Sequence, residues 1–385
     1  MPKQYLKVPN LRFAFQEEWN NDVFQNIVIN RKEKYNPTTS SNDFKCIELD
    51  SLSQNTGELL ITYNSKDQKS IKSKFYLNDV LYGKLRPYLR KYYHPMFDGV
   101  CSSEIWVFSS KILDPLFLYQ YIQTSNFNEL ANISSGSKMP RADWAVISDS
   151  LIYYPNKDEM KKIGYFLSLL DQRIQTQNKI IEDLIALRKS IIERTFSLVN
   201  SSWNKFTFND IFIERKEMHI KDSSVIHATL SKEGIFPKTD RYDRDFLVKD
   251  EDKKYKVSYL NDICYNPANL KFGVITRNNY GKCIISPIYV TYEVKPNFNP
   301  KFIELFVTRS AFLKEIRKYE QGTVYERMAV SSDDFLTYTT RLPDVDFQNE
   351  IVSKIDLFDK KITQEKIYLE LLKNQKNYLL SNLFI

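Results

Sequence analysis

The amino-acid sequence predicts an α+β fold: two pseudo-repeated mixed α/β domains separated by two long antiparallel coiled-coil helices. Three observations predict this fold. The chain of 385 residues contains one pattern twice, each copy begins with mixed strand and helix signals, and each copy ends in a long helix without proline. Copies of about 185–190 residues are each long enough to bury a core.

The internal repeat is visible as matched residues at a nearly constant shift. At the start of each copy the shift is 184 residues, which matches Trp19 with Trp203, Phe24 with Phe208, and Arg31-Lys32-Glu33 with Arg215-Lys216-Glu217. Near the end the shift is 188, which matches Pro155 with Pro343, Asp171 with Asp359, and Phe196 with Phe384. Such a repeat indicates one supersecondary plan used twice. We expect domains at 1–155 and 201–343, a central spacer helix at 156–200 and a distal spacer helix at 344–385.

The first part of each copy combines strand and helix signals. Residues 44–49, 71–82 and 100–108 are rich in strand formers and lie beside turn signals such as Asp98-Gly99. Leu116 to Leu130 predicts a helix opened by Asp114-Pro115. The corresponding expectations in the second copy are strands in 254–265 and 283–294 and a helix over 300–318.

The second part of each copy predicts a coiled-coil helix. No proline occurs between 156 and 200 or between 344 and 385, and apolar residues there recur with the alternating 4-3 spacing of a helix seam. The seam residues of the first helix are Ile163, Leu167, Leu170, Ile174, Gln177, Ile181 and Leu184. Those of the second are Ile351, Ile355, Phe358, Ile362, Glu365, Leu369 and Leu372.

Two cations on the seam favour antiparallel packing of these helices. Parallel packing in register would place Arg188 opposite Lys376, two like charges in a dry seam. Antiparallel packing places them opposite Ile355 and Leu167, from where the long side chains can reach water. Gln177 meets Glu365 in either arrangement and can fix the register. The alternative is that each helix packs only on its own domain.

Composition excludes several classes of protein. The net charge of +7 is a mild preference for anionic partners, and 42% hydrophobic residues are typical of a globular protein. The four cysteines form no C-x-x-C pair, and the three histidines have no metal-ligand spacing, so we predict neither disulfides nor a zinc site. No apolar run of 18 residues and no signal segment occurs, which predicts a soluble cytoplasmic protein.

Catalytic motifs are missing from the sequence. It contains no G-x-G-x-x-G, Walker A loop, G-x-S-x-G or H-E-x-x-H motif. Asn266-Pro267-Ala268-Asn269 is only partly similar to the Asn-Pro-Pro-aromatic loop of amino-methyltransferases, because it lacks the second proline and the aromatic residue. We therefore expect a chain without catalytic residues and without a bound cofactor or metal.

A dense basic-aromatic cluster spans Tyr82 to Tyr93, with four cations and four tyrosines in twelve residues. Arginine and lysine bind phosphates or the O6/N7 edge of guanine, and tyrosine contacts sugar or phosphate. The alternative is a solvated strand end with its aromatics in the core. The candidate DNA-binding residues in and around this cluster are Lys84, Arg86, Tyr88, Arg90 and Lys91.

A second candidate is the loop Ser134 to Arg141, whose small, polar and basic residues suit a backbone that approaches phosphates. The alternative is an ordinary turn before the next strand. Its counterpart in the second copy is Glu320 to Arg327. In the second copy, Lys271 and Arg277 fall near the position of the first cluster, although the match is loose. The candidates from these segments are Ser137, Lys138, Arg141, Lys271, Arg277, Thr323, Tyr325 and Arg327.

Several segments together resemble the specificity subunit of type I restriction-modification systems. They are Trp19…Arg31 to Pro37, Gly83 to Arg90, Asp98 to Glu104 and Phe166 to Ile174. The first of them supplies one more candidate for DNA contact, Lys34. The segment Tyr265 to Gly273, at the place of Gly83 to Arg90, lacks the paired arginines.

The resemblance implies a non-catalytic protein that binds double-stranded DNA. Two target-recognition domains each read one half of a split site, and the long helices space them and dock two methyltransferase subunits. Restriction subunits join for cleavage, and the S-adenosylmethionine, ATP and magnesium belong to the partners. The divergence between about 35–135 and 219–321 suits two readers of different sequences. The alternative is a helical scaffold protein whose two domains bind other proteins.

Overall fold

The computed structural model describes residues 8–15, 17–135, 139–197, 203–220, 225–238, 254–322 and 328–385. They form two compact units: unit 1 comprises Met1–Ile180 and Glu365–Ile385, and unit 2 comprises Ile181–Gln364. Each unit thus combines one mixed domain with parts of both long helices. The predicted four-segment division of the chain stays a prediction. Within the described ranges, no helix is long and apolar enough to cross a membrane.

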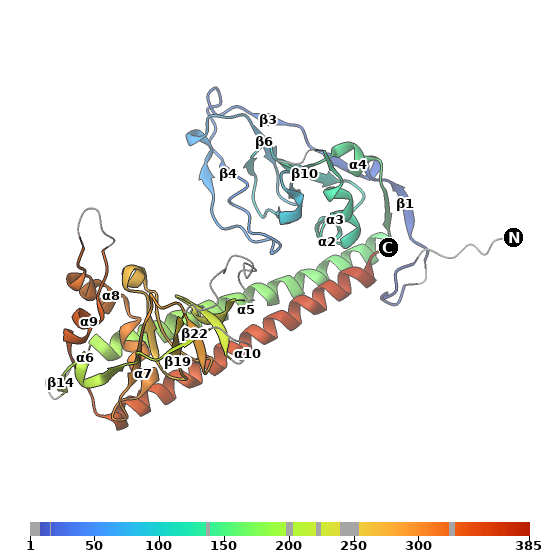
Figure 1. Ribbon diagram of the computed structural model, residues 1–385. Helices are drawn as coiled ribbons and strands as arrows, with labels where there is room; N and C mark the ends of the chain where they lie inside the picture. Colours follow the sequence, from blue (N-terminus) through green and yellow to red (C-terminus); the bar gives the residue numbers. More distant parts are fainter. Residues whose placement is uncertain are drawn as a thin grey trace. The chain divides into compact units, whose positions relative to one another are not determined.

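Unit 1 contains a two-stranded, a four-stranded and a five-stranded sheet, together with the short pair β11–β12 (Figure 1). The strand orders are β1-β13, β2-β10-β7-β8 and β3-β6-β9-β4-β5, and within the last sheet β4 and β9 are parallel. The strands are β1 Asn20–Val23, β2 Val28–Asn30, β3 Lys34–Tyr35, β4 Lys45–Ile47, β5 Tyr63–Asn64, β6 Lys72–Phe75, β7 Val80–Gly83, β8 Tyr92–Tyr93, β9 Gly99–Cys101, β10 Ile105–Ser110, β11 Ser134–Ser135, β12 Arg141–Ala142 and β13 Leu151–Tyr154.

Unit 2 repeats these three sheets strand by strand. The orders are β14-β24, β15-β23-β20-β21 and β16-β19-β22-β17-β18, again with one parallel pair, β17–β22. The strands are β14 Asn204–Thr207, β15 Phe212–Glu214, β16 Met218–Ile220, β17 Ile226–Ser231, β18 Gly234–Pro237, β19 Lys254–Ser258, β20 Ile263–Tyr265, β21 Ile275–Arg277, β22 Cys283–Ile285, β23 Val290–Val294 and β24 Thr339–Leu342. The two copies therefore share topology even in the middle, where their sequences diverge.

The repeated Arg-Lys-Glu motif has a structural role in both units. Arg31 donates two hydrogen bonds of 3.1 Å to Asp79 and lies 4.8 Å from the ring centre of Tyr76, while Glu33 accepts from the Tyr76 hydroxyl. The same contacts recur in unit 2 among Arg215, Asp262, Tyr259 and Glu217. The motif thus fixes the turn before β7 and β20.

The strand predicted over 71–82 is two strands, and so is the strand predicted over 254–265. In each copy an asparagine with positive φ separates them: 69° at Asn78 and 73° at Asn261. Asparagine tolerates this left-handed conformation better than most residues. The next residue, Asp79 or Asp262, accepts a backbone N–H from three residues earlier and closes the turn.

Each predicted mid-domain helix is also broken, so the prediction of one continuous helix was wrong. Unit 1 has α2 Pro115–Tyr121 and α3 Ser125–Asn132, and unit 2 has α7 Pro300–Val307, α8 Ser310–Ile316 and the 3-10 turn η6 Arg317–Tyr319. The backbone is extended at Thr124 and at Arg309, which interrupts the helical hydrogen-bond series. Thr124 also caps α3 by accepting from the Phe127 N–H. Among the described residues, the remaining short helices and 3-10 turns are α1 Phe24–Ile27, α4 Trp144–Ser148, α6 Phe208–Ile211, α9 Ser332–Thr337, η1 Ser65–Asp67, η2 Pro87–Leu89 and η5 Pro267–Phe272.

The long helices are α5 Lys157–Ser197 and α10 Val345–Leu383, and they pack antiparallel as predicted (Figure 1). In unit 1, Asp171, Arg173 and Gln177 of α5 contact Lys376, Tyr368 and Glu365 of α10, so the numbering falls along one helix as it rises along the other. In unit 2, Arg188 contacts Asp359. The predicted meeting of Gln177 and Glu365 is confirmed.

Every predicted seam residue is buried or half-buried. Buried are Ile163, Leu167, Gln177, Ile181, Ile351, Ile355, Ile362, Leu369 and Leu372, and half-buried are Leu170, Ile174, Leu184, Phe358 and Glu365. Packing on the domain, the alternative considered for these helices, also occurs: Ile163 and Leu167 belong to the core of unit 1, and Ile351 and Ile355 to that of unit 2. Both long helices are therefore stabilised by each other and by the domain cores.

Of the two seam cations, Lys376 does not reach water as predicted, whereas the side chain of Arg188 is 28% exposed. Lys376 is buried and forms an ion pair with Asp171, and Arg188 forms one with Asp359 at 2.5 Å. Each carboxylate lies four residues, one helical turn, beyond the apolar residue predicted to face the cation. The shift of 188 residues exchanges the two pairs, so they are the same contact in the two copies.

Gly164 marks a close approach of α5 to the start of α2. An added Cβ would lie 2.7 Å from the Phe117 nitrogen and 2.9 Å from the Leu116 carbonyl carbon, both backbone atoms. We expect Gly164→Ala to lower the free energy of unfolding by about 1–3 kcal/mol through overpacking. Helix propensity alone would raise it by about 1 kcal/mol. The sign of the shift in the urea midpoint therefore checks the close approach, and a higher midpoint would contradict it.

Candidate nucleic-acid interface

Two of the predicted loops, distant in sequence, lie side by side in unit 1. Arg86 N–H donates to the Pro140 carbonyl at 2.8 Å, Ala142 N–H donates to the Lys84 carbonyl at 2.9 Å, and Leu85 pairs with Arg141. We call residues 84–91 and 139–142 together the basic strip. The fold thus unites the two segments that sequence reasoning had selected separately.

The backbone of the basic strip is a tight turn flanked by two arginines. Pro87–Leu89 forms η2, and Arg86 and Arg90 on either side have φ of 53° and 48°. This left-handed conformation costs a non-glycine residue roughly 1–2 kcal/mol. Such strain persists only where surrounding contacts determine the backbone, and it gathers at functional sites.

Three candidate side chains of the basic strip are available for a ligand. Arg86 is exposed, Tyr88 is 56% exposed and Lys84 is half-buried. Among the described residues, none of the three has a side-chain hydrogen bond or ion pair. Two cations and a tyrosine in and beside one tight turn form an arrangement that suits contact with phosphate and sugar in a nucleic acid.

Three other candidate cations already have partners within unit 1. Arg90 donates to the Gln123 carbonyl at 2.6 Å, Lys91 to the Leu49 carbonyl at 2.5 Å, and Arg141 pairs with Glu104 at 3.0 Å. The hydrogen bond that Arg141 donates to Glu104 raises the pKa of Arg141. These contacts hold the strip in place, so its free cations are fewer than the sequence suggested.

The remaining candidate of unit 1 lies outside the basic strip. Lys34 is exposed on β3 of the five-stranded sheet, where its ammonium donates to Ser73 at 3.2 Å. Ser137 and Lys138 lie outside the described residues, as do Thr323, Tyr325 and Arg327 of unit 2. Their predicted contacts with DNA stay predictions.

Unit 2 has a counterpart of the strip with weaker basic character. Val330 N–H donates to the Pro267 carbonyl at 3.2 Å, which matches the bond from Ala142 to Lys84 in unit 1. Lys271 is half-buried, with its ammonium 5.5 Å from the centre of the Phe272 ring. In place of two left-handed arginines, η5 ends at Gly273 with φ of 82°.

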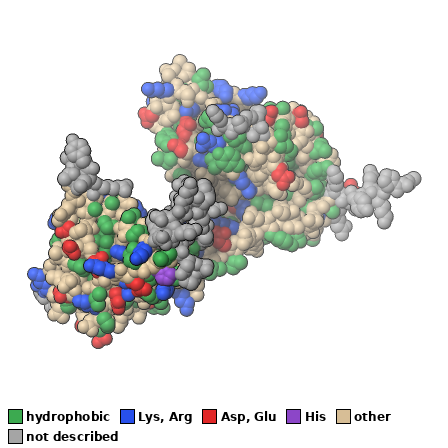
Figure 2. Space-filling view, in the orientation of Figure 1, with side chains coloured by type: hydrophobic (Ala, Val, Ile, Leu, Met, Phe, Trp, Pro, Cys, Tyr) green, Lys and Arg blue, Asp and Glu red, His purple; other side chains and the backbone are tan. Residues whose placement is uncertain are grey.

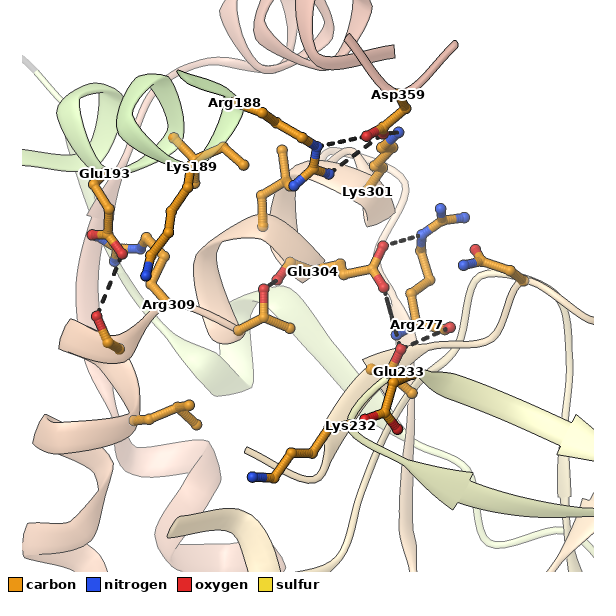
Figure 3. Close-up of a pocket in the computed structure, with 17 residues that line it drawn as sticks. Arg188, Lys189, Glu193, Lys232, Glu233, Arg277, Lys301, Glu304, Arg309 and Asp359 are labelled. Carbon is orange, nitrogen blue, oxygen red and sulfur yellow. Dashed lines mark hydrogen bonds and ion pairs between the residues drawn. The ribbon is translucent and has the colours of Figure 1, made fainter. Parts of the chain in front are cut away.

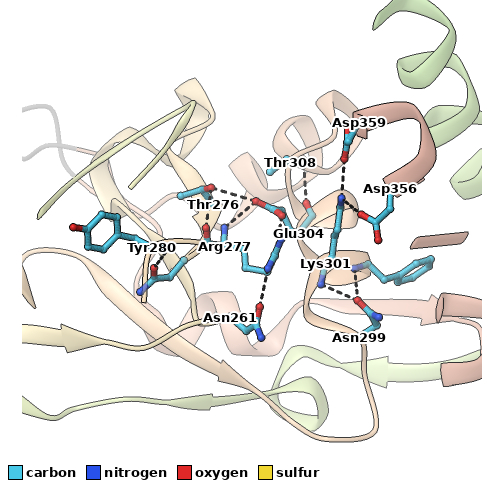
Figure 4. Close-up of polar contacts among 12 residues, drawn as sticks. Asn261, Thr276, Arg277, Tyr280, Asn299, Lys301, Glu304, Thr308, Asp356 and Asp359 are labelled. Atoms are coloured by element: carbon cyan, nitrogen blue, oxygen red, sulfur yellow. Dashed lines mark hydrogen bonds and ion pairs between the residues drawn. The ribbon is translucent and has the colours of Figure 1, made fainter. Parts of the chain in front are cut away.

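Arg277 of β21 contacts α7 instead of the η5 segment. Its guanidinium pairs with Glu304 at 3.0 Å and donates to Asn261 at 2.7 Å (Figure 4). It also borders a cavity of about 630 Å³ within unit 2, whose charged side chains pair largely with one another (Figure 3). No histidine or cysteine is among the described residues that line this cavity, so it offers neither a thiol nucleophile nor an imidazole base.

Groups suited to other chemistry are buried or dispersed. All four cysteines are buried and unpaired, and burial raises the pKa of Cys283 to about 11. Among the described side chains, no group of three or more His, Cys, Asp or Glu could hold a metal ion. On the face of unit 2 in Figure 2, Lys and Arg are interspersed with Asp and Glu. The basic strip is thus the strongest candidate site.

This chain is similar to specificity proteins of type I restriction-modification systems. Residues 20–185 match the family described as the type I restriction modification DNA specificity domain. The specificity subunit of the type I restriction enzyme EcoDI from Escherichia coli is 30% identical over 132 residues, which cover 33% of this chain and 30% of that protein. The chain thus matches less than a third of the length of this curated relative.

Two solved structures have the same fold along nearly the whole chain. One comes from work on complex assembly and conformational transition of the type I R-M system, with a TM-score of 0.61, 14% identity and coverage of 97% of this chain and 99% of the other. The other is the type I restriction-modification S subunit from M. genitalium, with a TM-score of 0.55, 14% identity and coverage of 98% and 99%. They support the predicted fold class.

The matched segment defines the class of the first copy: a restriction-modification DNA specificity domain. Within it, residues 20–185 of the chain are similar to the DNA specificity domain of type I restriction-modification systems, as the sequence motifs implied. The matched range includes the segment 84–91 and the loop 139–142, so the basic strip lies within the family's domain.

Proposed function

We propose that this chain is the DNA-recognition subunit of a type I restriction-modification complex. The single observation that carries the proposal is the basic strip within the specificity domain, where Lys84, Arg86 and Tyr88 stand on a turn held by Arg90, Lys91 and Arg141. A backbone that is already fixed before binding presents these side chains to phosphates with a smaller loss of entropy. The chain itself would carry no catalytic step.

The finer proposal is a bipartite site with one half read by each unit. It is supported by the repeated sheets and by the different chemistry of the two strips, with two left-handed arginines in unit 1 and a lysine followed by Gly273 in unit 2. Equal folds with unequal contact residues suit two half-sites of different sequence.

The proposed partners are two methyltransferase subunits and the restriction subunits, within the cytoplasm. S-adenosylmethionine, ATP and magnesium would bind to those partners. Docking on the long helices is supported by exposed apolar side chains in unit 1: Phe166 and Leu169 of α5 and Leu371 of α10 are 39%, 44% and 60% exposed. Large apolar side chains that gather on an exposed face are typical of interfaces.

The salt dependence of DNA binding tests the proposal against the scaffold alternative. If several cations contact phosphates, the logarithm of the binding constant falls linearly with the logarithm of salt, by about 0.9 per contact. We expect a slope of about −4 or steeper for the chain with its methyltransferase on duplex DNA. A flat response, or no binding at low salt, would favour a protein that binds other proteins.

Each long helix begins in one unit and ends in the other, which makes the spacing of half-sites testable. Four residues inserted at matched places near Ile180 in α5 and Gln364 in α10 add about 6 Å to each helix. We expect the preferred gap between half-sites to change while both half-site sequences stay the same. Methylation mapping checks this, and an unaltered gap would contradict the role of the helices in spacing.

A further inference from the structure

A buried glutamine links the basic strip to the long helices within unit 1. Gln123 lies between α2 and α3 and is only 2% exposed. Its backbone carbonyl accepts the Arg90 guanidinium at 2.6 Å, and its side-chain oxygen accepts the Lys376 ammonium at 2.6 Å. One residue therefore joins a cation of the strip to a cation of α10.

The α10 side of this link is a buried ion pair. Lys376 is 9% exposed and pairs with Asp171 of α5, which also accepts from the Gln120 side chain at 2.7 Å. Burial lowers the pKa of Lys376. A buried ammonium needs all of its acceptors, so its position is determined from both sides. A continuous series of polar contacts thus runs from Arg90 through Gln123 and Lys376 to Asp171.

Unit 2 has the ion pair without the link. Arg188 and Asp359 occupy the places of Lys376 and Asp171, and Lys301 of α7 pairs with Asp359 at 2.7 Å (Figure 4). The position of Gln123, counted from the first proline of α2 and of α7, is held by Thr308, whose hydroxyl donates to the Glu304 carbonyl at 2.7 Å. Among the described residues, no contact joins Arg188 to the η5 segment.

We propose that Lys376 is a positioning residue for DNA recognition: through Gln123 it holds Arg90, and thereby the strained turn that presents Arg86 and Tyr88. The left-handed backbone at Arg86 and Arg90 requires such outside support. The paired helices then determine the shape of the strip in unit 1, while no such polar link to the helices occurs among the described residues of its counterpart in unit 2. That the strip reads DNA rests on the proposed function; the link itself does not.

Hydrogen exchange on the full chain tests the link without DNA. Gln123→Met removes the acceptor for Lys376 but leaves the Lys376–Asp171 pair and the carbonyl that binds Arg90. We expect the amides of Arg86, Leu89 and Arg90 to exchange at least about tenfold faster, the ratio that loss of one charge-assisted hydrogen bond gives. These amides donate to Pro140, Arg86 and Pro87 in the folded strip.

Variants at the cation separate positioning from general stability. Lys376→Met should have the same effect on the strip, and Lys376→Arg should restore slow exchange, because arginine serves at the matching position 188. The control Arg188→Met removes the equivalent pair of unit 2 and should leave the strip unchanged. Unchanged exchange in Gln123→Met would overturn the proposal. So would equally accelerated exchange throughout unit 1 in Gln123→Met and Lys376→Met.

A second readout with DNA keeps the two proposals apart. In complex with its methyltransferase, Gln123→Met should lose about tenfold in discrimination at one half-site and none at the other. Loss at neither half-site despite faster exchange would keep the link and contradict DNA reading by the strip. Equal loss at both half-sites would overturn the positioning role, since unit 2 has no such link among its described residues.

Discussion

Asp171→Ala is expected to lower the free energy of unfolding of unit 1 by about 3–5 kcal/mol, because it leaves the Lys376 ammonium buried without its counter-charge. The side chains of this pair are only 13% and 11% exposed. The substitution also removes the acceptor of the Gln120 amide, a second polar group of the interior. Loss of one partner of a buried pair costs more than the pair contributes, since the remaining charge stays out of water.

The matched substitution Asp359→Ala in unit 2 should cost only about 0–1 kcal/mol. There the side chains of Arg188 and Asp359 are 28% and 37% exposed, so the arginine regains water when its partner is lost. Lys301 also keeps a second carboxylate, Asp356. The same ion pair between α5 and α10 is thus buried in unit 1 and partly exposed to water in unit 2.

Tryptophan fluorescence during urea unfolding measures this difference. Trp19, Trp106 and Trp144 lie in unit 1, and only Trp203 lies in unit 2, so the signal reports mainly unit 1. Asp171→Ala should move the fluorescence midpoint to clearly lower urea, and Asp359→Ala should leave it almost unchanged. Equal shifts for the two variants would contradict the burial of the Lys376 pair.

The double substitution Lys84→Ala/Arg86→Ala is expected to weaken DNA binding about 10- to 100-fold and to reduce the salt slope by about 1.8, since each lost phosphate contact removes about 0.9. Neither side chain has a partner among the described residues, so the free energy of unfolding should change by less than about 0.5 kcal/mol. Binding isotherms at several salt concentrations and a urea titration check both expectations.

A control of equal charge is Lys354→Ala/Lys360→Ala on α10, where both lysines are exposed. It lowers the net charge as much as the strip variant does, and so corrects for long-range attraction. We expect less than a threefold loss of affinity from it, within the spread of long-range screening effects. Equal losses from the two double variants would show that net charge, and not the basic strip, governs binding.

The long helices and the repeat could be predicted because their signals are local or periodic. The seam from Ile163 to Leu184 follows helical spacing, and the fixed shift revealed the second copy. The same shift also matched the residues of the two ion pairs. Asp171 and Asp359 were matched as repeats, and Arg188 and Lys376 occupied equivalent seam positions. The sequence analysis placed Lys376 opposite Leu167 and Arg188 opposite Ile355. Each carboxylate lies one helical turn beyond that facing residue, so a search one turn along the helix would have predicted both ion pairs.

The breaks and the site depend on contacts that a sequence does not display. Leu116 to Leu130 is apolar enough for one helix, and only the cap at Thr124 and the core around Phe127 divide it. Leu85 and Arg141 are more than fifty residues apart in the sequence, so no local sequence pattern predicts that they pair. Arg86 and Arg90 are both arginines, so the sequence does not tell their roles apart. Arg90 is a structural support because Gln123 lies within hydrogen-bond distance of it, whereas the side chain of Arg86 has no such partner among the described residues.

Mapping of methylated bases tests the central claim most directly. The chain is expressed with the methyltransferase encoded nearest to it, and modified bases are located by single-molecule sequencing of the host genome. The account predicts a split motif with two defined halves and an unspecified gap, and a lower fraction of methylated sites in Lys84→Ala/Arg86→Ala, because lost phosphate contacts weaken binding at every site. A stable complex that methylates no site, or a double variant that methylates the same fraction of sites, would contradict it.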